Sequence, residues 1–435
     1  MRHLFPRDVE RKFPIAERGE GVWIWDTDGK RYLDADSGAI SVISVGHGSA
    51  DVVAAMSEQA SRLAYVHNGQ FENQPAEDLA DLLAEIAPGD MNRSLFVSGG
   101  SEAVETAIKI ARQYHVLNGD PDRHIVLSRD RSYHGATLLA LELSGTPARQ
   151  EVYRPYFQGH AKVPTPDAYR GDDGSALASA DEVEATILRL GPEKVSAFIA
   201  EPIVAAAQPG LTPPPAYYER IREICDEHGV LFIADEVVTG FGRTGTAFGI
   251  EHWDAVPDMI ATAKGLAGGY VPLAAVLMRD RIADTFESRS TSFVHGLTYE
   301  AHPVACAAGL AVLRIILRDG LIENARNRGD QLAQGLEAIR SSHAVIGDVR
   351  GKGLLMGLEF VADRETKKPL EPAGEFARRL HLAAQENGLM IYPGAPPFGG
   401  ASDQVLISPP LIIKPEEVAT ILEILDETLR EVVPA

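Results

Sequence analysis

The chain has 435 residues, of which 45% are hydrophobic and 24% charged, so it is long enough for two to three globular domains with large cores. Its 41 Lys and Arg against 62 Asp and Glu give a formal net charge of −21, which argues against nucleic-acid and anionic-membrane partners because both attract cationic proteins. Cys225 and Cys306 are too few for a disulfide framework, and neither a signal peptide nor a membrane-spanning apolar run is visible. We therefore expect a cytoplasmic protein.

The chain begins with a hairpin pattern and then alternates between strand and helix patterns. The hairpin is predicted over 21–33, with its turn at Asp28-Gly29. Strands are then predicted at 94–98, 125–127, 195–200, 230–234 and 273–278, and helices at 102–115, 216–228 and 302–317, the second of them closed by Gly229. This alternation predicts βαβ units and an α/β fold with a mostly parallel sheet that helices cover on both faces.

The last third of the chain repeats smaller helix and strand patterns. A helix at 375–387 is predicted to stop at Gly388, and a strand at 389–392 leads into a Pro/Gly-rich loop at 392–404. An amphipathic helix at 416–432 closes the chain. The Ala-rich helix at 302–317 is a candidate for the long connection between two domains.

Ligands of open parallel sheets bind beyond the carboxyl ends of the strands, so unusual residues at those positions are candidates for a binding site. Ser98-Gly99-Gly100-Ser101-Glu102 joins a strand to a helix, and its backbone N–H groups and the Ser101 hydroxyl suit a phosphate. The alternative is a plain capping box with Ser101 as the N-cap. Ser132-Tyr133-His134-Gly135 follows the next strand, where a tyrosine can lie against a flat heteroaromatic ring or simply pack.

Two further segments carry charged groups at strand ends. Asp235 directly follows an apolar strand and needs a partner, which a protonated pyridine nitrogen, a helix N-terminus or an arginine would provide. No residue near it has convincing metal-ligand spacing, so no metal is expected. Lys264 lies in a stretch of small uncharged residues, Ala261-Thr262-Ala263-Lys264-Gly265. A lysine in an apolar pocket has a lowered pKa and becomes nucleophilic, as Schiff-base chemistry requires, although most lysines are surface residues.

Together, in this order, these segments resemble the class III aminotransferases, which are pyridoxal-phosphate enzymes of fold type I. The resemblance extends over almost the whole chain. It is most specific in Asp235-Glu236-Val237-Val238-Thr239-Gly240-Phe241-Gly242-Arg243-Thr244-Gly245, Pro257-Asp258-Met259-Ile260 and Lys264-Gly265, and it includes Gly100-Ser101-Glu102-Ala103, Tyr133-His134-Gly135, Glu201-Pro202, His295-Gly296-Leu297-Thr298-Tyr299, Gly46-His47 and the segment Trp25-Asp26-Thr27-Asp28-Gly29 with Tyr32-Leu33-Asp34. The resemblance implies a large cofactor-binding domain at 50–319 and a small domain made from residues 1–49 and 320–435.

The resemblance also implies the roles of individual residues. Lys264 would form the Schiff base with pyridoxal 5′-phosphate, and Asp235 would pair with its pyridine nitrogen. Val237 would pack on one face of the ring and Tyr133 would stack on the other. The freed Lys264 amine would then carry a proton between the substrate α-carbon and the cofactor. The activity implied is transfer of an amino group from an amine or ω-amino acid to a keto acid such as pyruvate or 2-oxoglutarate.

The remaining implied roles concern the phosphate and the surroundings of the ring. Gly100 and Ser101 would hold the phosphate, and His134 is carried over as a cofactor-binding residue with the motif that contains it. Glu201 would lie near the cofactor and tune the site. Thr298 would reach the phosphate of the neighbouring subunit, which implies a homodimer with shared active sites, or a tetramer built from it.

The chain departs from the family pattern at two places. Gly99 stands where many relatives have Ser, which removes one hydroxyl from the phosphate turn. No Arg or Lys lies between Pro393 and Ser408, where many class III enzymes carry an arginine that binds a substrate carboxylate. Arg149, Arg154 and Arg170 are candidates for this role only because they follow the Tyr133 segment, and a solvated surface position is the favoured explanation for each. Phe71 and residues 39–42 are candidates for the substrate pocket or for the core.

Three functions are compatible with these patterns. The first is an aminotransferase. The second keeps the cofactor but labilises another bond, as aminomutases, racemases and a decarboxylating transaminase of the same family do. The third is a non-catalytic α/β binding protein, or a nucleotide enzyme using the turn at Gly99-Gly100-Ser101. The nucleotide function is disfavoured because the chain has no Gly-x-x-x-x-Gly-Lys and no Gly-x-Gly-x-x-Gly after a predicted strand with a following acidic residue for the ribose.

Overall fold

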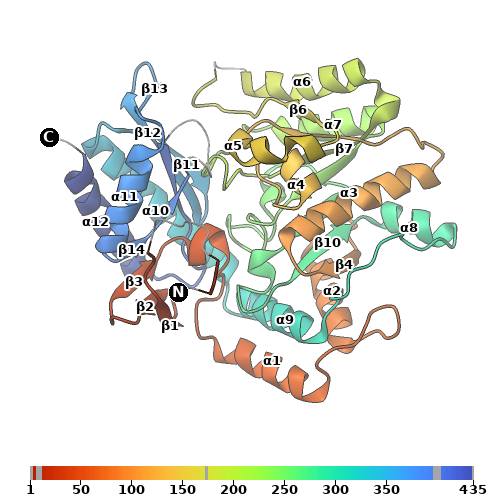
Figure 1. Cartoon of the computed structure of the whole chain (residues 1–435), viewed down its shortest axis with the longest axis horizontal. Coiled ribbons are helices and arrows are strands. Elements are labelled where there is room, and N and C mark those ends of the chain that lie inside the picture. Colours follow the sequence, from red (N-terminus) through yellow and green to blue (C-terminus); the bar gives the residue numbers. More distant parts are fainter. Residues whose placement is uncertain (1–2, 6–11, 172–174, 395–402, 434–435) are drawn as a thin grey trace.

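The computed structural model of the chain describes residues 3–5, 12–171, 175–394 and 403–433. Its centre is a seven-stranded sheet, and two smaller sheets of four and five strands are formed by the N- and C-terminal parts of the chain. Figure 1 shows the large sheet and its helices as one body and the two smaller sheets as another beside it. The chain thus folds as a mixed α/β protein, as its alternating patterns predict.

The large sheet has the strand order β4-β10-β9-β8-β7-β5-β6. Strands β9, β8, β7, β5 and β6 are parallel to one another, whereas β10 runs antiparallel to both β9 and β4. The prediction of a mostly parallel sheet is therefore confirmed. The strands span Arg93–Val97 (β4), Ile125–Arg129 (β5), Ala161–Val163 (β6), Val195–Ala200 (β7), Leu231–Asp235 (β8), Met259–Thr262 (β9) and Ala274–Met278 (β10).

Helices cover both faces of this sheet because its parallel strands are apolar on both sides. Neighbouring residues of β7 show this: Phe198 belongs to one apolar cluster and Ile199 to another, on opposite faces. The helices of this part span Ala50–Arg62 (α1), Gln74–Ile86 (α2), Gly100–Leu117 (α3), Leu138–Leu143 (α4), Pro147–Gln150 (α5), Ser175–Leu190 (α6), Tyr217–His228 (α7), Asp280–Ser288 (α8) and Pro303–Arg318 (α9). As predicted, α7 is closed by Gly229 in the left-handed conformation.

The four-stranded sheet joins the two ends of the chain. The hairpin of β2 and β3 is as predicted, and β14 adds to β3 in parallel with Leu389 opposite Leu33. The prediction of one strand at 389–392 is wrong. The structure has two short strands there in different sheets, because the chain pairs with β3 before Ile391 and with a strand of the five-stranded sheet after it. The sheet consists of Ala16–Glu20 (β1), Trp23–Asp26 (β2), Arg31–Asp34 (β3) and Leu389–Met390 (β14).

The five-stranded sheet packs with the three remaining α-helices. Its strands are Ile346–Lys352 (β11), Leu355–Asp363 (β12), Lys368–Pro369 (β13), Tyr392–Pro393 (β15) and Asp403–Ile407 (β16), and the helices are Leu321–Ser342 (α10), Glu375–Glu386 (α11) and Pro415–Val432 (α12). Most of the predicted loop at 392–404 lies outside the described residues. The domain bounds at 49 and 319 stay predictions.

Short helical turns connect several elements. They are Ser37–Ser41 (η1), Glu151–Tyr156 (η2), Pro192–Lys194 (η3), Gly249–His252 (η4) and Lys264–Leu266 (η5). Both cysteines are free and buried, and burial raises the pKa of each thiol to about 12. Within the described parts of the chain, no helix has the length and apolar character needed to cross a membrane.

Candidate active site

A cavity of about 180 Å³ gathers the residues that follow the carboxyl ends of the parallel strands. Of the nine residues that the sequence analysis assigns to the cofactor, eight line it: Gly100, Ser101, Tyr133, His134, Glu201, Asp235, Val237 and Lys264. Larger cavities beside α1 and α2 contain none of them. The structure thus brings together residues that are separated by up to 164 positions, which the parallel order of the strands had led us to expect.

Lys264 lies just beyond the end of β9. It is the first residue of η5 and has φ +43, a backbone conformation that residues other than glycine rarely adopt. Burial lowers the pKa of its amine to about 8, against the opposing effect of the nearby carboxylates of Asp235 and Glu201. A sizeable share of this amine is therefore neutral near pH 8, which makes it a nucleophile.

Asp235 ends β8 and is buried beside His134. One carboxylate oxygen lies 2.7 Å from His134 Nδ1, and the other accepts the Val237 N–H at 3.1 Å. The partner of this buried carboxylate is thus a histidine. The prediction of an arginine as the partner of Asp235 is wrong. His134 Nε2 is buried without a partner, so the ring is fixed mainly through Asp235. A carboxylate that is buried and oriented in this way suits a cationic nitrogen on a ligand.

The turn between β4 and α3 forms one wall of the cavity. Gly99 is the N-cap of α3, and Glu102 accepts the Ser98 N–H at 2.8 Å, so the alternative with Ser101 as N-cap is wrong. The Ser101 hydroxyl instead accepts the Ala136 N–H at 3.0 Å. A Cβ at Gly100 would come within 3.0 Å of Val237 Cγ1, which explains a glycine there. The first N–H groups of α3 are available to an anion, as at any helix start.

Glu201 supports the segment that carries Tyr133. Its carboxylate oxygens accept the Tyr133 N–H at 3.0 Å and the Ala205 N–H at 3.3 Å, and burial raises the pKa of the carboxyl group. Its backbone carbonyl accepts hydrogen bonds from Arg129 and from the Tyr218 hydroxyl. Glu201 therefore fixes the backbone of Tyr133, whose ring lines the cavity.

The three arginines named from the sequence lie in different surroundings. Arg154 is a surface residue, paired with Glu151 at 2.8 Å, as the simpler explanation held. Arg170 is bound to the buried carboxylate of Glu359. It is therefore neither a solvated surface residue nor a residue that lines the cavity. Arg149 lies with its guanidinium carbon 4.7 Å from the centre of the Tyr133 ring. Of the three, Arg149 alone contacts a residue that lines the cavity.

Three other named residues or segments do not line this cavity. Thr298 is exposed, and its carbonyl accepts a hydrogen bond from the Tyr65 hydroxyl at 2.6 Å. Phe71 is 64% exposed, so its assignment to the core is wrong. Residues 39–42 overlap η1, a turn in which five consecutive residues have positive φ. Within this chain, therefore, the cavity is formed without these residues.

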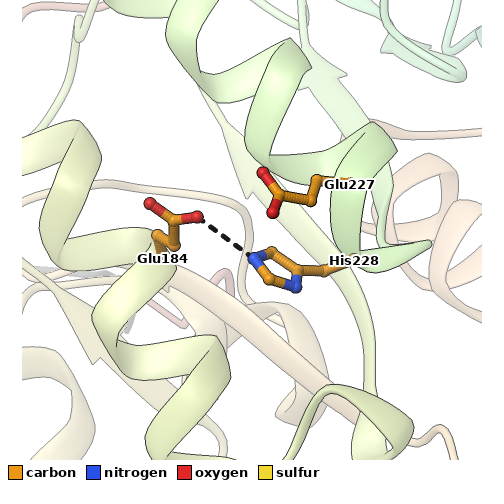
Figure 2. A group of neighbouring side chains, drawn as sticks. All are labelled: Glu184, Glu227 and His228. Carbon is orange, nitrogen blue, oxygen red and sulfur yellow. Dashed lines mark hydrogen bonds and ion pairs between the residues drawn. The ribbon is translucent and has the colours of Figure 1, made fainter.

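A second group of titratable side chains lies between α6 and α7. Figure 2 shows Glu184 and Glu227 with their carboxylates near the ring of His228, a group that could hold a metal ion. Glu184 already binds His228 Nε2 at 3.2 Å through one oxygen and Arg220 at 2.6 Å through the other. These contacts join α6 to α7, and none of the group lines the active-site cavity.

A cavity with a buried lysine, an aspartate held by histidine and a helix N-terminus is typical of a pyridoxal-phosphate enzyme, and comparisons with known proteins agree. Residues 4–429 match the family described as aminotransferase class-III. The chain therefore belongs to the class III aminotransferases. It is 41% identical to the uncharacterized aminotransferase YodT of Bacillus subtilis (99% of this chain, 98% of that protein), and 36% identical to taurine–pyruvate aminotransferase of Bilophila wadsworthia (96% and 92%).

Solved structures give the same result. An (S)-enantioselective omega-transaminase from Thermomicrobium roseum superimposes with a TM-score of 0.92 at 38% identity, over 100% of this chain and 97% of the other. An amine transaminase from an uncultivated Pseudomonas species, solved with pyridoxal phosphate bound, superimposes with a TM-score of 0.91 at 35% identity, over 100% and 98%. The fold is that of fold type I pyridoxal-phosphate transaminases.

Two features of the site were not found from the sequence. The position of His134 beside Tyr133 at a strand end indicated that His134 lies at the site. Nothing in the local sequence indicated that its partner is Asp235. The stacking of Arg149 on Tyr133 had no local signal, because Arg149 lies on a short helix 16 positions further along the chain.

Proposed function

We propose that this aminotransferase uses pyridoxal 5′-phosphate to move an amino group from an amine or ω-amino acid to a keto acid such as pyruvate or 2-oxoglutarate. The two substrates would react in turn, with the cofactor carrying the amino group as pyridoxamine phosphate between them. The observation that carries the proposal is that Lys264 and the buried Asp235–His134 pair line one cavity with the start of α3.

The residues of the cavity fit this cofactor. The N–H groups at the start of α3 and the Ser101 hydroxyl would hold the phosphate, and Asp235 would face the pyridine nitrogen. Val237 and Tyr133 would enclose the ring, with the absence of a side chain at Gly100 leaving room beside Val237. When bound, the cofactor supplies an electron sink that acidifies the hydrogen on the amine-bearing carbon of the substrate.

The protein's own groups would then control the proton. Asp235 would face the ring nitrogen, and it is held in place by His134 Nδ1 and the Val237 N–H. The free Lys264 amine would take the proton from the substrate carbon as a general base and return it as a general acid. Its lowered pKa suits both directions near neutral pH.

The proposal includes a homodimer. Thr298 is exposed and lies outside the cavity of its own subunit, and we propose that it serves the phosphate site of a second subunit. A cytoplasmic setting belongs to the same proposal, and the acidic net charge of −21 favours small-molecule partners over nucleic acids.

Borohydride trapping combined with a donor panel tests the proposal. Reduction of the loaded enzyme should attach a pyridoxyl group to Lys264, found by peptide mapping, and Lys264→Ala should lower the rate of amino transfer by roughly 10²- to 10⁴-fold. Amine donors, each paired with pyruvate or 2-oxoglutarate, should change the absorption spectrum of the bound cofactor and give an aminated product.

The outcomes separate the competing functions. Label on another residue, or no label, would rule out the proposal and every other function that uses the cofactor at Lys264. Isotope exchange at the substrate carbon without amino transfer would identify a racemase or aminomutase instead, and release of CO₂ a decarboxylating transaminase.

A further inference from the structure

A fully buried arginine lies behind the active-site cavity and has no part in the reaction proposed above. Arg129 is the last residue of β5, and its exposed fraction is 0%. Its guanidinium donates to the backbone carbonyl of Glu201 and, at 3.2 Å, to the Tyr218 hydroxyl, and both of these acceptors are neutral. Among the described residues, its Nε has no hydrogen-bond partner. A buried cation held only by neutral groups is costly, so the position of Arg129 calls for an explanation.

Arg129 joins the ends of two neighbouring strands beneath the cavity. The Glu201 carbonyl, directly after β7, accepts hydrogen bonds from Arg129 and, at 2.6 Å, from the Tyr218 hydroxyl of α7. The carbonyl of Arg129 accepts the Ser132 hydroxyl at 2.8 Å, which ties the start of the Tyr133 segment to the end of β5. Arg129 therefore contacts the backbone of Glu201 with its side chain and the segment before Tyr133 with its own backbone.

The side chain of Glu201 accepts hydrogen bonds on both of its oxygens. Oε1 accepts the Tyr133 N–H at 3.0 Å, and Oε2 accepts the Ala205 N–H at 3.3 Å. A protonated carboxyl group would carry a hydrogen on one of these oxygens, and that oxygen would then meet an N–H group as a donor. The geometry therefore selects the ionised form. Since Glu201 is only 4% exposed, its charge needs a positive charge nearby.

Three cationic side chains act on the Glu201 carboxylate. His134 is shared with Asp235, whose oxygen lies 2.7 Å from Nδ1. Lys264 has a pKa that burial lowers to about 8, and its amine is the group that reacts with the cofactor. Arg129 stays cationic throughout: burial works against its charge, but the neighbouring tyrosine hydroxyls and the Glu201 carboxylate outweigh it, so the pKa of the guanidinium is above its ordinary value.

We infer that Arg129 is a positioning residue of the active site, whose buried charge keeps Glu201 ionised and thereby keeps both Glu201 oxygens as acceptors for the backbone that carries Tyr133. The inference rests on the proposed function, in which Tyr133 encloses the cofactor ring. Arg129 does not line the cavity, and it acts on the reaction only through Glu201. The cavity thus depends on a charge that lies outside it.

Four variants separate the charge of Arg129 from its packing. Arg129→Met removes the charge and keeps a long side chain, Glu201→Gln makes the target neutral, and the double variant tests whether the two residues act as one unit. Arg123→Met is the matched control. Arg123 also donates to two backbone carbonyls, those of Val195 at 2.9 Å and His228 at 3.1 Å, but Val195 begins β7, at the opposite end of the strand from Glu201.

Infrared difference spectra of the cofactor-free proteins would report the ionisation of Glu201 directly. The difference between wild type and Glu201→Gln at pH 7 should contain the band of a carboxylate and no band of a protonated acid. In the Arg129→Met background the same difference should contain the protonated acid, whereas the Arg123→Met background should match the wild type. A carboxylate in the Arg129→Met background would overturn the inference. So would a protonated Glu201 in the wild type, a result that does not depend on whether Arg129→Met folds.

The pH dependence of cofactor uptake by the cofactor-free protein provides a second readout. Uptake needs the neutral Lys264 amine. Burial lowers its pKa to about 8, with Arg243 acting in the same direction and Asp235 and Glu201 opposing. Loss of the Glu201 charge removes one opposing effect. The midpoint of uptake should therefore fall by roughly one pH unit in Glu201→Gln and in Arg129→Met, and by no more than that in the double variant.

The direction of the shift distinguishes the explanations. Removal of a cation that acts directly on Lys264 would raise the midpoint, and a purely structural role would leave it unchanged in a folded protein. Either result would overturn the inference, as would additive shifts in the double variant or an equal shift in Arg123→Met. If the wild type takes up no cofactor at Lys264, the proposed function fails, while the infrared spectra still decide whether Arg129 controls Glu201.

Discussion

Lys264 shows how the surroundings of one residue set its chemistry. A free lysine amine has a pKa of 10.5, and burial in the cavity lowers it to about 8 although two carboxylates oppose the shift. Burial disfavours the ammonium form more than Asp235 and Glu201 favour it. The same amine is thereby made nucleophilic at a pH at which surface lysines are almost fully protonated.

The pH dependence of cofactor uptake follows from this pKa. Only the neutral amine attacks the aldehyde of pyridoxal phosphate, so uptake by the cofactor-free protein should be slow at low pH and rise to half its maximum near pH 8. Rapid-mixing absorbance between pH 6 and 11 would measure it, with Lys264→Ala as the blank. A midpoint near the ordinary lysine value of 10.5 would contradict the prediction.

At the scale of elements, the loop after β5 meets the start of α3 at one wall of the active-site cavity. Gly135 has φ +147, and a Cβ there would come within 2.5 Å of Ser101 Oγ and 2.8 Å of Ala140 Cβ. The loop after β5 can therefore approach the start of α3 only with glycine at this position. This approach lets the Ala136 N–H donate to Ser101.

Replacing Gly135 should thus affect both stability and cofactor binding. We expect Gly135→Ala to lower the free energy of unfolding by about 1–3 kcal/mol and to weaken binding of pyridoxal phosphate roughly 10-fold, because Ser101 must move. Denaturant unfolding and fluorescence titration would measure the two effects.

Gly119→Ala is the matched control, since Gly119 also has positive φ (+91) but nothing within 4 Å of a new Cβ. It should lose some stability and keep its affinity for the cofactor. If both variants bind the cofactor equally well, the close approach of Gly135 to Ser101 has no functional role.

At the scale of the whole molecule, the N- and C-terminal parts of the chain are joined through the four-stranded sheet. One residue of the predicted site, Thr298, lies outside the cavity. The parallel pairing of β14 with β3 brings the C-terminal part to the N-terminal hairpin. Thr298, by contrast, lies on an exposed segment next to Tyr65 and Tyr299. In the proposed homodimer, Thr298 would reach the phosphate site of a second copy of the chain.

Mixed dimers test this arrangement. Lys264→Ala removes the attachment point of the cofactor, and Thr298→Ala removes the proposed contact with the phosphate of the other subunit. In a hybrid of one chain of each variant, one site therefore carries both defects and the other site carries neither. At limiting pyridoxal phosphate, the hybrid should bind about one cofactor per dimer with wild-type affinity. Borohydride fixation followed by intact-mass analysis would count it. If affinity in the hybrid equals that of the Thr298→Ala homodimer, Thr298 serves its own subunit or none.

The sequence alone determined the fold class and the composition of the site. Apolar strands alternating with amphipathic helices specify a parallel sheet, and the carboxyl ends of such strands meet at one edge. Gly100, Tyr133, Asp235 and Lys264 were therefore predicted together from their positions after successive strands. Each of these residues lies in a turn or at a strand end, and such positions can be recognised from the neighbouring residues in the sequence.

Only the tertiary structure decided which side chains pair across that edge. His134 and Asp235 are 101 residues apart, and their contact depends on the order of strands in the sheet. The stacking of Arg149 on Tyr133 and the change of sheet at Ile391 also depend on tertiary packing. The periodicity of a sequence shows which face of a helix or strand is buried, but it does not show which element packs against that face. Long-range packing thus decided which residue pairs with Asp235 and which residue stacks on Tyr133.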